Sequence, residues 1–245
     1  MREEGQFSLE DLLVALQAAD PRRRASAAWG LRAYDDPAAS DALIDALDDQ
    51  VGEVRRNAAA ALGSFTDPLL VPALLSHLDD PVPAVRAALV GALGQVGDAS
   101  SVNALITMLR DSDLFVQAES IWALGQIADE RAAEPLLEFL SHRDDRVVIT
   151  AIWAIGRIGD ISGVRPLLGM LRHANPDIQA SAVTALGSIG HPGTVPAIAH
   201  LLGNENVVYA GTQDEARLCD IAAIALTMIG SEDALKAVSD WQQGR

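Results

Sequence analysis

The sequence predicts an all-α fold, a right-handed α-solenoid built from tandem two-helix units. The 245 residues divide into units of about 31 residues, which start at Phe7, Ala38, Leu69, Ser100, Arg131, Ser162 and Gly193. The chain is 49% hydrophobic and 4% aromatic, and its alanine, leucine and isoleucine content favours helix. Self-similarity at this period is typical of stacked repeats. We therefore expect one repeat domain over residues 1–245.

The aligned units share columns of one residue type. One column is Leu16, Leu47, Leu78, Leu109, Leu140, Leu171 and Leu202. An alanine column is Ala61, Ala92, Ala123, Ala154, Ala185 and Ala225, and a glycine column is Gly63, Gly94, Gly125, Gly156 and Gly187. Asp36, Asp67, Asp98, Asp129 and Asp160 close the units, where they are expected to cap the next helix. Several columns in phase indicate duplication.

The third unit shows how each unit predicts two helices. Its segment VPALLSHL, over 71–78, carries apolar residues at helical spacing. After the turn DDPVPA, the segment VRAALVGALGQVG carries a second apolar stripe and ends at Gly97, which tolerates a left-handed cap. Because neither short helix can bury its apolar face alone, the units must stack.

The C-terminal unit departs from the pattern. The segment NENVVYAGTQDEAR, over 204–217, replaces a five-residue turn and adds nine residues. Loops of this length are either functional or merely tolerated. A final helix over about 233–243, which includes Trp241, is expected to cap the array.

The charge balance excludes a general nucleic-acid surface. The chain has 18 Lys and Arg against 34 Asp and Glu, a formal net charge of −16, whereas phosphate binding needs clustered bases. The arginines at 22–24 and 55–56 leave a local basic patch open, but a structural ladder is favoured. An acidic surface of this kind favours neutral or basic partners and a monomer when free.

Membrane insertion, export and disulfide formation are not expected. No window approaches the roughly 18 uninterrupted apolar residues of a membrane helix. The start MREEGQFSLEDLL has acids where a signal peptide has bases. The single cysteine, Cys219, cannot form an internal disulfide and is expected to be a small buried side chain. We therefore expect a cytoplasmic location.

The pattern VRxxAxxALGxIGD, preceded by a PxLLxxL helix and a DxD-like turn, resembles HEAT repeats. It resembles most closely the short type, of about 31 residues, named after the phycobilisome (PBS) lyases, and covers about Phe7 to Trp241. The resemblance implies the fold but not the function, because such arrays serve as scaffolds, adaptors, chaperone-like factors and, in a few families, catalytic subunits. The opening RRRASAAWGLRAYDD is also similar to the N-terminal unit of bilin lyase subunits.

HEAT proteins typically form a ladder between an Asp in the turn and an Arg at the start of the second helix. The ladder residues here are Arg24, Arg55 and Arg86 with Asp49, Asp80 and Asp111. Later units have Gln117, Val148 and Gln179 in the Arg column and His142 and His173 in the Asp column. We therefore expect the ladder to stop near the middle of the chain and the packing between units to be looser there.

Three of the four tryptophans share one column. Trp122, in SIWALGQIAD, and Trp153, in AIWAIGRIGD, lie 31 residues apart, and Trp29 occupies the same position in the first unit. With the core stripe set by Val147, Ala151, Ile155 and Ile158, Trp153 lies roughly 145° from its centre. These rings therefore face away from their own core, toward the groove that second helices line in HEAT-like arrays.

This column predicts the partner-binding surface. Its residues are Leu114, Phe115, Glu119, Trp122 and Gln126 in the fourth unit, Arg146, Ile149, Trp153 and Arg157 in the fifth, and Trp29 in the first. Because neighbouring helices lie about 10 Å apart, Phe115, Trp122, Ile149 and Trp153 should form one apolar patch. Exposed aromatics with arginines beside them are typical of interfaces. The alternatives are that the rings pack on one another, that the patch joins two copies, and that Trp29 only caps the array.

No catalytic or metal-binding motif is present. GxGxxG, GxxxxGK and HExxH are absent, as are the His-Glu pairs of iron-binding HEAT-like hydroxylases. The five histidines lack ligand spacing, although His142 and His173 could share a metal with Asp111. We expect no catalytic residue, metal or cofactor.

The expected function is a non-catalytic scaffold or adaptor that binds a helix or an extended segment of a partner polypeptide in the groove. The alternative is a subunit of a phycobilin lyase, or another chromophore-handling or chaperone-like factor. In that case groove aromatics would stack on a linear tetrapyrrole, and Asp145 or Asp220 would hold its pyrrole nitrogens.

Overall fold

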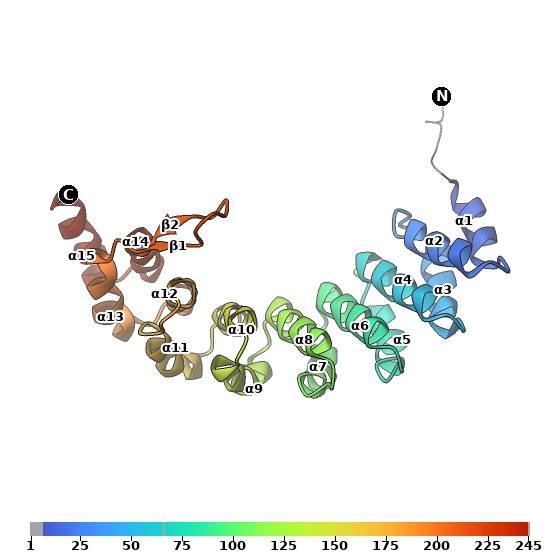
Figure 1. Ribbon diagram of the computed structural model, residues 1–245, viewed down its shortest axis with the longest axis horizontal. Helices are drawn as coiled ribbons and strands as arrows, with labels where there is room; N and C mark the ends of the chain where they lie inside the picture. Colours follow the sequence, from blue (N-terminus) through green and yellow to red (C-terminus); the bar gives the residue numbers. More distant parts are fainter. Residues whose placement is uncertain (1–6, 66, 245) are drawn as a thin grey trace, which may run out of the picture. The chain divides into compact units, whose positions relative to one another are not determined.

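The computed structural model describes residues 7–65 and 67–244, which form two compact units, Met1–Ile127 and Ala128–Arg245. Figure 1 shows that both consist of short paired helices, which confirms the predicted all-α class. The helices of the first unit are α1 (Leu9–Leu16), α2 (Pro21–Leu31), α3 (Pro37–Asp45), α4 (Gly52–Leu62), α5 (Val71–Ser76), α6 (Pro83–Val96), α7 (Val102–Met108) and α8 (Leu114–Ile127).

The second unit continues the pattern of a short first helix and a longer second one. Its elements are α9 (Ala133–Leu137), α10 (Asp145–Ile158), α11 (Val164–Met170), α12 (Pro176–Ile189), α13 (Val195–Ala199), β1 (Val207–Val208), β2 (Ala216–Arg217), α14 (Leu218–Ile229) and α15 (Glu232–Gln243). In both units, 3-10 turns extend the first helices, such as η1 (Ala46–Asp48) after α3 and η6 (Glu138–Ser141) after α9. In the described part of the chain, no helix is long and apolar enough to cross a membrane.

The aspartates that close the units cap the next helical turn, as predicted. The Oδ1 atom of Asp36 accepts from the Ala38 N–H at 2.8 Å, and that of Asp98 accepts from the Ser100 N–H at 2.6 Å. His191, one repeat after Asp160, plays the same part, with Nδ1 accepting from the Gly193 N–H at 3.1 Å. Such side chains satisfy backbone donors that have no partner within the helix.

The glycine and alanine columns meet between successive second helices. A Cβ atom on Gly63 would lie 2.9 Å from the Ala92 Cα, and one on Gly156 would lie 2.8 Å from the Ala185 Cα. The same contact joins Gly187 to Ala225 across the nine-residue insertion, at 2.9 Å. At each position a larger side chain would force the two helices apart.

The core lies between first and second helices and between neighbouring second helices. The leucine column is buried throughout, from Leu16 at 5% exposure to Leu202 at 8%. In α10 the buried set differs from the predicted stripe: Val148 and Ile152 are buried, whereas Val147 and Ile158 are only half-buried. The reason is that α10 packs on both α9 and α12, which turns its buried face toward α12.

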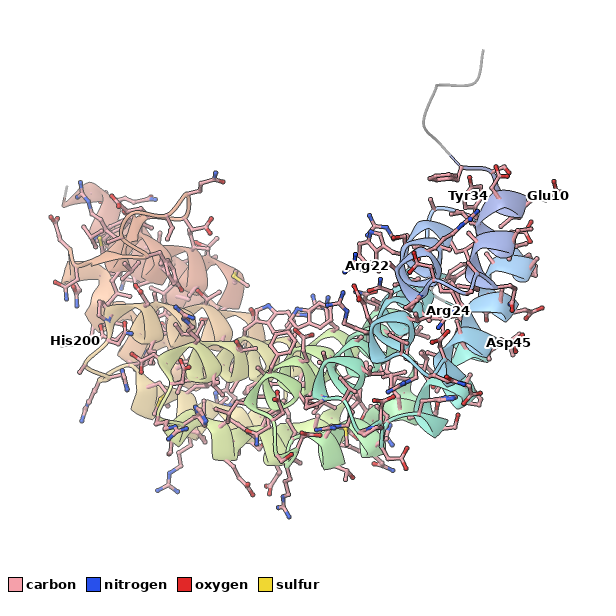
Figure 2. All side chains as sticks on the ribbon, turned by 45° about the vertical axis from the view of Figure 1, so that its right-hand side comes forward. Glu10, Arg22, Arg24, Tyr34, Asp45 and His200 are labelled. Carbon is pink, nitrogen blue, oxygen red and sulfur yellow. The ribbon has the colours of Figure 1, made fainter. Side chains whose placement is uncertain are left out.

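The Arg–Asp ladder forms in the Met1–Ile127 unit. Arg24, Arg55 and Arg86 donate to Asp49, Asp80 and Asp111 through Nε at 2.6, 2.6 and 2.7 Å; Figure 2 labels Arg24, the first of them. Each arginine also bonds a backbone carbonyl six residues earlier, for example Arg86 Nη1 to the Asp80 oxygen at 2.7 Å. Each ladder arginine therefore joins the turn of its own repeat to the turn of the next repeat.

The later repeats keep the hydrogen bond from the side chain to the carbonyl six residues earlier, and they lose the ion pair to the next repeat. Gln117 donates to the Asp111 carbonyl and Gln179 to the His173 carbonyl, both at 2.6 Å, as the arginines do six residues back. His173 Nδ1 accepts from the Asn175 N–H at 3.1 Å, where an Asp would accept. In residues 7–65 and 67–244, Asp111 is the last carboxylate bridged in this way. The looser packing expected beyond it stays a prediction.

The inserted loop forms a small hairpin. Strands β1 and β2 pair antiparallel, with Val207 opposite Arg217. The Tyr209 N–H donates to Asp177 Oδ1 at 2.6 Å, and its hydroxyl lies 3.1 Å from Ser181 Oγ. Since Asp177 and Ser181 both belong to α12, the hairpin is fastened to the preceding second helix.

Candidate functional site

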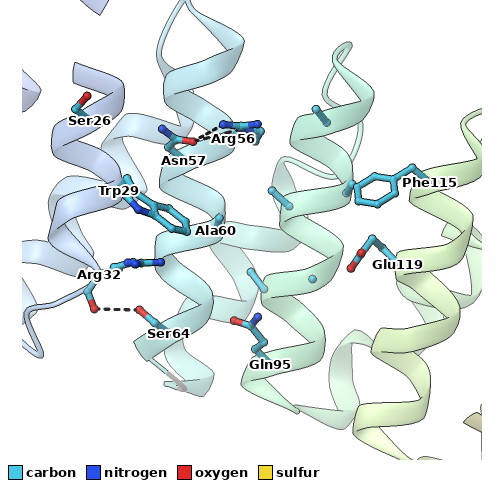
Figure 3. A pocket seen from close by; sticks show the side chains of 15 residues that line it. Ser26, Trp29, Arg32, Arg56, Asn57, Ala60, Ser64, Gln95, Phe115 and Glu119 are labelled. Carbon is cyan, nitrogen blue, oxygen red and sulfur yellow. Dashed lines mark hydrogen bonds between the residues drawn. The ribbon is translucent and has the colours of Figure 1, made fainter. Parts of the chain in front are cut away.

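The Met1–Ile127 unit contains an open groove of about 820 Å³. The groove lies across the second helices of successive repeats. Figure 3 shows it between α2, which carries Trp29, and α8, which carries Phe115. The floor, on α4 and α6, consists of small residues: Ala60, Ala84, Ala87, Ala88, Gly91 and Ala92. Ala60 and Gly91 occupy the tryptophan column of their units, so the groove exists because two successive units lack the ring.

One end of the groove is aromatic and cationic. Trp29 is 44% exposed, and the Arg32 guanidinium carbon lies 3.7 Å from the centre of its ring, a cation–π arrangement. Arg56, on α4, points its guanidinium at the Asn57 Oδ1, with Nη2 at 3.0 Å, and Asn57 in turn donates to the Ala25 carbonyl at 2.9 Å. In the described residues, neither arginine has a carboxylate within ion-pair distance.

The other end is aromatic and acidic. Phe115 is 63% exposed, and Glu119 lies one helical turn further along α8. Burial raises the pKa of the Glu119 carboxyl. Oε2 lies over the floor, 3.6 Å from where a Cβ atom on Gly91 would be. No residue of the described chain donates a hydrogen bond to this carboxylate or pairs with it.

The predicted residues of the fourth unit divide between groove and flank. Phe115 and Glu119 line the groove, as Trp29 does. Trp122 is half-buried, with Cζ3 3.4 Å from where a Cβ atom on Gly94 would be, so its ring lies against α6. Leu114, 51% exposed, and Gln126 are at the surface of α8 outside the groove.

The predicted residues of the fifth repeat lie in the compact unit Ala128–Arg245. Trp153 is 36% exposed, and the Arg157 guanidinium carbon lies 6.0 Å from its ring centre. Arg146 is exposed and Ile149 is half-buried. The continuous patch expected from Phe115, Trp122, Ile149 and Trp153 combines residues of both units, and it stays a prediction.

A metal cluster is not found in the part of the chain that the structure describes: no group of three or more His, Cys, Asp or Glu could hold an ion. The Nδ1 atoms of His142 and His173 accept backbone N–H groups two residues further on. Cys219 is buried at 1% exposure, as expected. The chemical groups that the groove itself presents are aromatic rings, two guanidinium groups and one carboxylate.

The family model for HEAT repeats matches the chain three times, over residues 9–83, 71–155 and 133–213. The chain belongs to the HEAT-repeat family. This confirms both the predicted resemblance and the repeat solenoid. No curated protein matches the sequence.

Solved structures similar to this HEAT-repeat protein include one of the complex of CpcE and CpcF of phycocyanin lyase from Nostoc sp. PCC7120. It is 27% identical with a TM-score of 0.62, and the match covers 100% of this chain and 97% of that one. An engineered protein is 22% identical with a TM-score of 0.63, over 96% and 71% of the two chains. A designed armadillo repeat protein in complex with the peptide (KR)4 is 21% identical with a TM-score of 0.60, over 75% and 100%. The last two show the fold alone.

The sequence analysis of this HEAT-repeat protein missed Arg32 and Asn57, and it named Arg56 only as part of a possible basic patch and not as a groove residue. Arg56 lies four residues before Ala60 in the tryptophan column, and Arg32 lies three residues after Trp29, so both follow from helical spacing. It also missed Ile224, which is 61% exposed on α14 and occupies the tryptophan column of the last unit. Its place directly before Ala225 of the alanine column, as Trp122 stands before Ala123, would have identified it.

Proposed function

We propose that this HEAT-repeat protein is a non-catalytic scaffold or adaptor that holds a segment of a partner polypeptide in the groove of the Met1–Ile127 unit. The observation that carries the proposal is the open groove of about 820 Å³ with exposed Trp29 and Phe115 at its two ends. Aromatic side chains and arginines dominate the binding energy of protein interfaces. Leaving them exposed around a hollow of small residues is costly unless a partner covers them.

The charge of the chain and its structural likeness support the same function. A net charge of −16 disfavours nucleic acid and favours partners with basic or neutral segments. One similar solved structure is itself a complex of two chains, CpcE and CpcF. We also propose a cytoplasmic location and a monomeric state when free; light scattering of the purified protein tests the second point.

A ring placed in the floor tests the proposal. Gly91→Trp gives α6 the side chain that α8 carries at Trp122 and should fill the groove, whereas Gly91→Ala adds only a methyl group. Random 12-residue peptides displayed on phage are selected on the full chain and then measured against both variants. We expect at least a tenfold loss of binding with Gly91→Trp and less than a twofold change with Gly91→Ala. Selection of no peptide sensitive to Gly91→Trp would contradict a groove that binds polypeptide.

The second candidate is a subunit that binds a linear tetrapyrrole, as in a lyase or another chromophore-handling factor. The observation that favours it is the likeness, at 27% identity over the whole chain, to the CpcE and CpcF complex of phycocyanin lyase. The residues fit such a group: Arg32 and Arg56 could hold its carboxylates, Trp29 could stack on a ring, and Glu119 could accept from pyrrole N–H groups. Asp145, considered for that part, accepts from Asn175 Nδ2 at 2.7 Å through Oδ2, and its role toward a tetrapyrrole stays a prediction.

An absorbance titration separates the two candidates. A tetrapyrrole held in the groove should show a shifted, intensified visible band on mixing phycocyanobilin with the wild-type protein, and none with Gly91→Trp. If the band is the same with and without protein, this second function is excluded. A peptide-binding scaffold would give that flat result while still capturing peptides.

A further inference from the structure

The two ends of the groove carry opposite charges that the protein does not neutralise. Glu119 lies over a floor of alanine and glycine, and in residues 7–65 and 67–244 no side chain or backbone N–H pairs with it. A partly buried carboxylate without a partner costs the folded state free energy. A cation supplied by an occupant would restore the lost interaction.

At the opposite end, Arg56 is held in place but not neutralised. Its guanidinium donates to Asn57 Oδ1 at 3.3 Å through Nε and at 3.0 Å through Nη2, and Asn57 is fixed by the Ala25 carbonyl. The ladder arginines, by contrast, all pair with aspartates. In a chain with 34 acidic residues and 18 basic ones, an oriented arginine without a carboxylate points to an anionic group in the occupant.

The spacing of the two charges limits the length of the occupant. Arg56 is on α4 and Glu119 on α8, with α6 between them (Figure 3). Because packed helices lie about 8–10 Å apart, the axes of α4 and α8 are separated by roughly 16–20 Å. Glu119 Oε2 lies 3.6 Å from where a Cβ atom on Gly91 of α6 would be, so the two charges are closer together than the axes. An extended chain rises about 3.3 Å per residue, so at most about six residues separate the two partner side chains.

The groove has room for an extended chain. It holds about 820 Å³ and is open to solvent. An extended segment with small side chains over the alanine floor fits that volume.

We propose that the groove binds an extended segment of a partner protein that places a Lys or Arg on Glu119 and, at most about six residues away, an Asp or Glu on Arg56. The aromatic rings of Trp29 and Phe115 cover the two ends of the segment. This inference rests on the proposed function and adds the chemistry and spacing of the partner's side chains. The opposite charges also define which way along the groove the segment lies.

Peptide selection and a matched pair of variants test this. Random 12-residue peptides displayed on phage are selected on the full chain, and peptides that also bind Gly91→Trp are removed. The peptides that remain are synthesised with a fluorescein label, and their binding to wild type, Glu119→Gln and Glu53→Gln is measured by fluorescence anisotropy. Glu53 is exposed on α4 outside the groove, so Glu53→Gln removes the same charge from the same unit. Thermal unfolding confirms that each variant folds.

The expected result is a basic and an acidic residue at a fixed spacing of at most about six positions in the selected peptides. Glu119→Gln should weaken their binding at least tenfold and Glu53→Gln less than twofold. The charge-reversed variant Glu119→Lys should prefer a peptide whose basic residue is replaced by Glu, which a merely structural role of Glu119 would not produce.

Two results would overturn the inference, and they differ in what they leave standing. If the peptides need an open groove but lack the charge pair, or lose equal affinity with both glutamate variants, the scaffold function stands and this inference falls. If no peptide depends on the groove, while phycocyanobilin binds wild type and not Gly91→Trp, both fall and the tetrapyrrole function is supported.

Discussion

A Cβ atom on Gly94 would lie 2.7 Å from the Cα atom of Ala123. That contact brings α6 and α8 together closely enough that Trp122, next to Ala123, lays its ring against α6. Gly91, three residues earlier in α6, is in a different position: outside its own helix, the nearest atom of the described residues to its Cβ would be Glu119 Oε2, at 3.6 Å. One glycine is required by packing, and the other leaves the floor of the groove empty.

The two glycines are therefore expected to respond to alanine with opposite signs. Gly94→Ala should destabilise the protein by about 1–3 kcal/mol, because backbone must move to admit the methyl group. Gly91→Ala should stabilise it by about 0.5–1 kcal/mol, because alanine loses less conformational entropy in a helix and meets no obstacle. Urea unfolding of the two variants and wild type, followed by circular dichroism, measures both. Equal shifts would mean that α6 and α8 are not in close contact at Gly94.

The ladder predicts that glutamine replaces arginine better than alanine does. Arg86 bridges Asp111, whose side chain is 5% exposed, and also donates to the Asp80 carbonyl at 2.7 Å. Gln117 keeps the second of these bonds in the next unit. Arg86→Ala should cost about 3 kcal/mol, because it leaves a buried carboxylate and a carbonyl unpaired, and Arg86→Gln about 1–2 kcal/mol less than that.

The same pair predicts a pH dependence. The hydrogen bond from Arg86 lowers the pKa of the Asp111 carboxyl in the folded protein. Stability gained from a lowered pKa is fully present above the unfolded value of about 3.9 and is lost as the pH falls through the folded pKa. The deficit of Arg86→Ala, measured by urea unfolding, should be constant from pH 5 to 7 and shrink below about pH 4. A deficit independent of pH would show that the lost stability comes from packing of the arginine stem.

Columns of repeated residues predicted the fold, while the groove was predicted only in part. The burial of the leucine column and the exposure of Trp153 both follow from the helical periodicity of apolar residues. The glycine column was recognised without its reason, since the contact of Gly156 with Ala185 depends on the distance between two helices. The groove was sought at large residues, but Ala60 and Gly91 create it through the side chains they lack.

Glu119 predicts a conflict between stability and binding. Burial raises the pKa of its carboxyl in the folded protein, so the charged form is disfavoured at neutral pH and the cost disappears as the pH falls through the raised pKa. Glu119→Gln should therefore stabilise the protein slightly at pH 7, by less than about 1 kcal/mol, while it weakens peptide binding. Thermal unfolding at pH 7 and near pH 4 measures the first effect, which should be smaller at the lower pH. Loss of stability at pH 7 would identify Glu119 as a structural residue.

The hairpin of the last unit predicts a local change without a global one. The Tyr209 backbone has φ of 55°, in the left-handed region, and its N–H donates to Asp177 Oδ1 at 2.6 Å. Asp177→Ala removes that acceptor, so the hairpin should open more often, and amide hydrogen exchange over 206–217 should accelerate roughly tenfold. Asp214→Asn is the control, because it changes the hairpin's charge and keeps the bond to α12. Exchange in α12 and α14 should stay unchanged, since the two helices also contact each other directly, where a Cβ atom on Gly187 would lie 2.9 Å from the Ala225 Cα. If exchange accelerates equally across α14, the insertion supports the core of this unit and is not merely fastened to its surface.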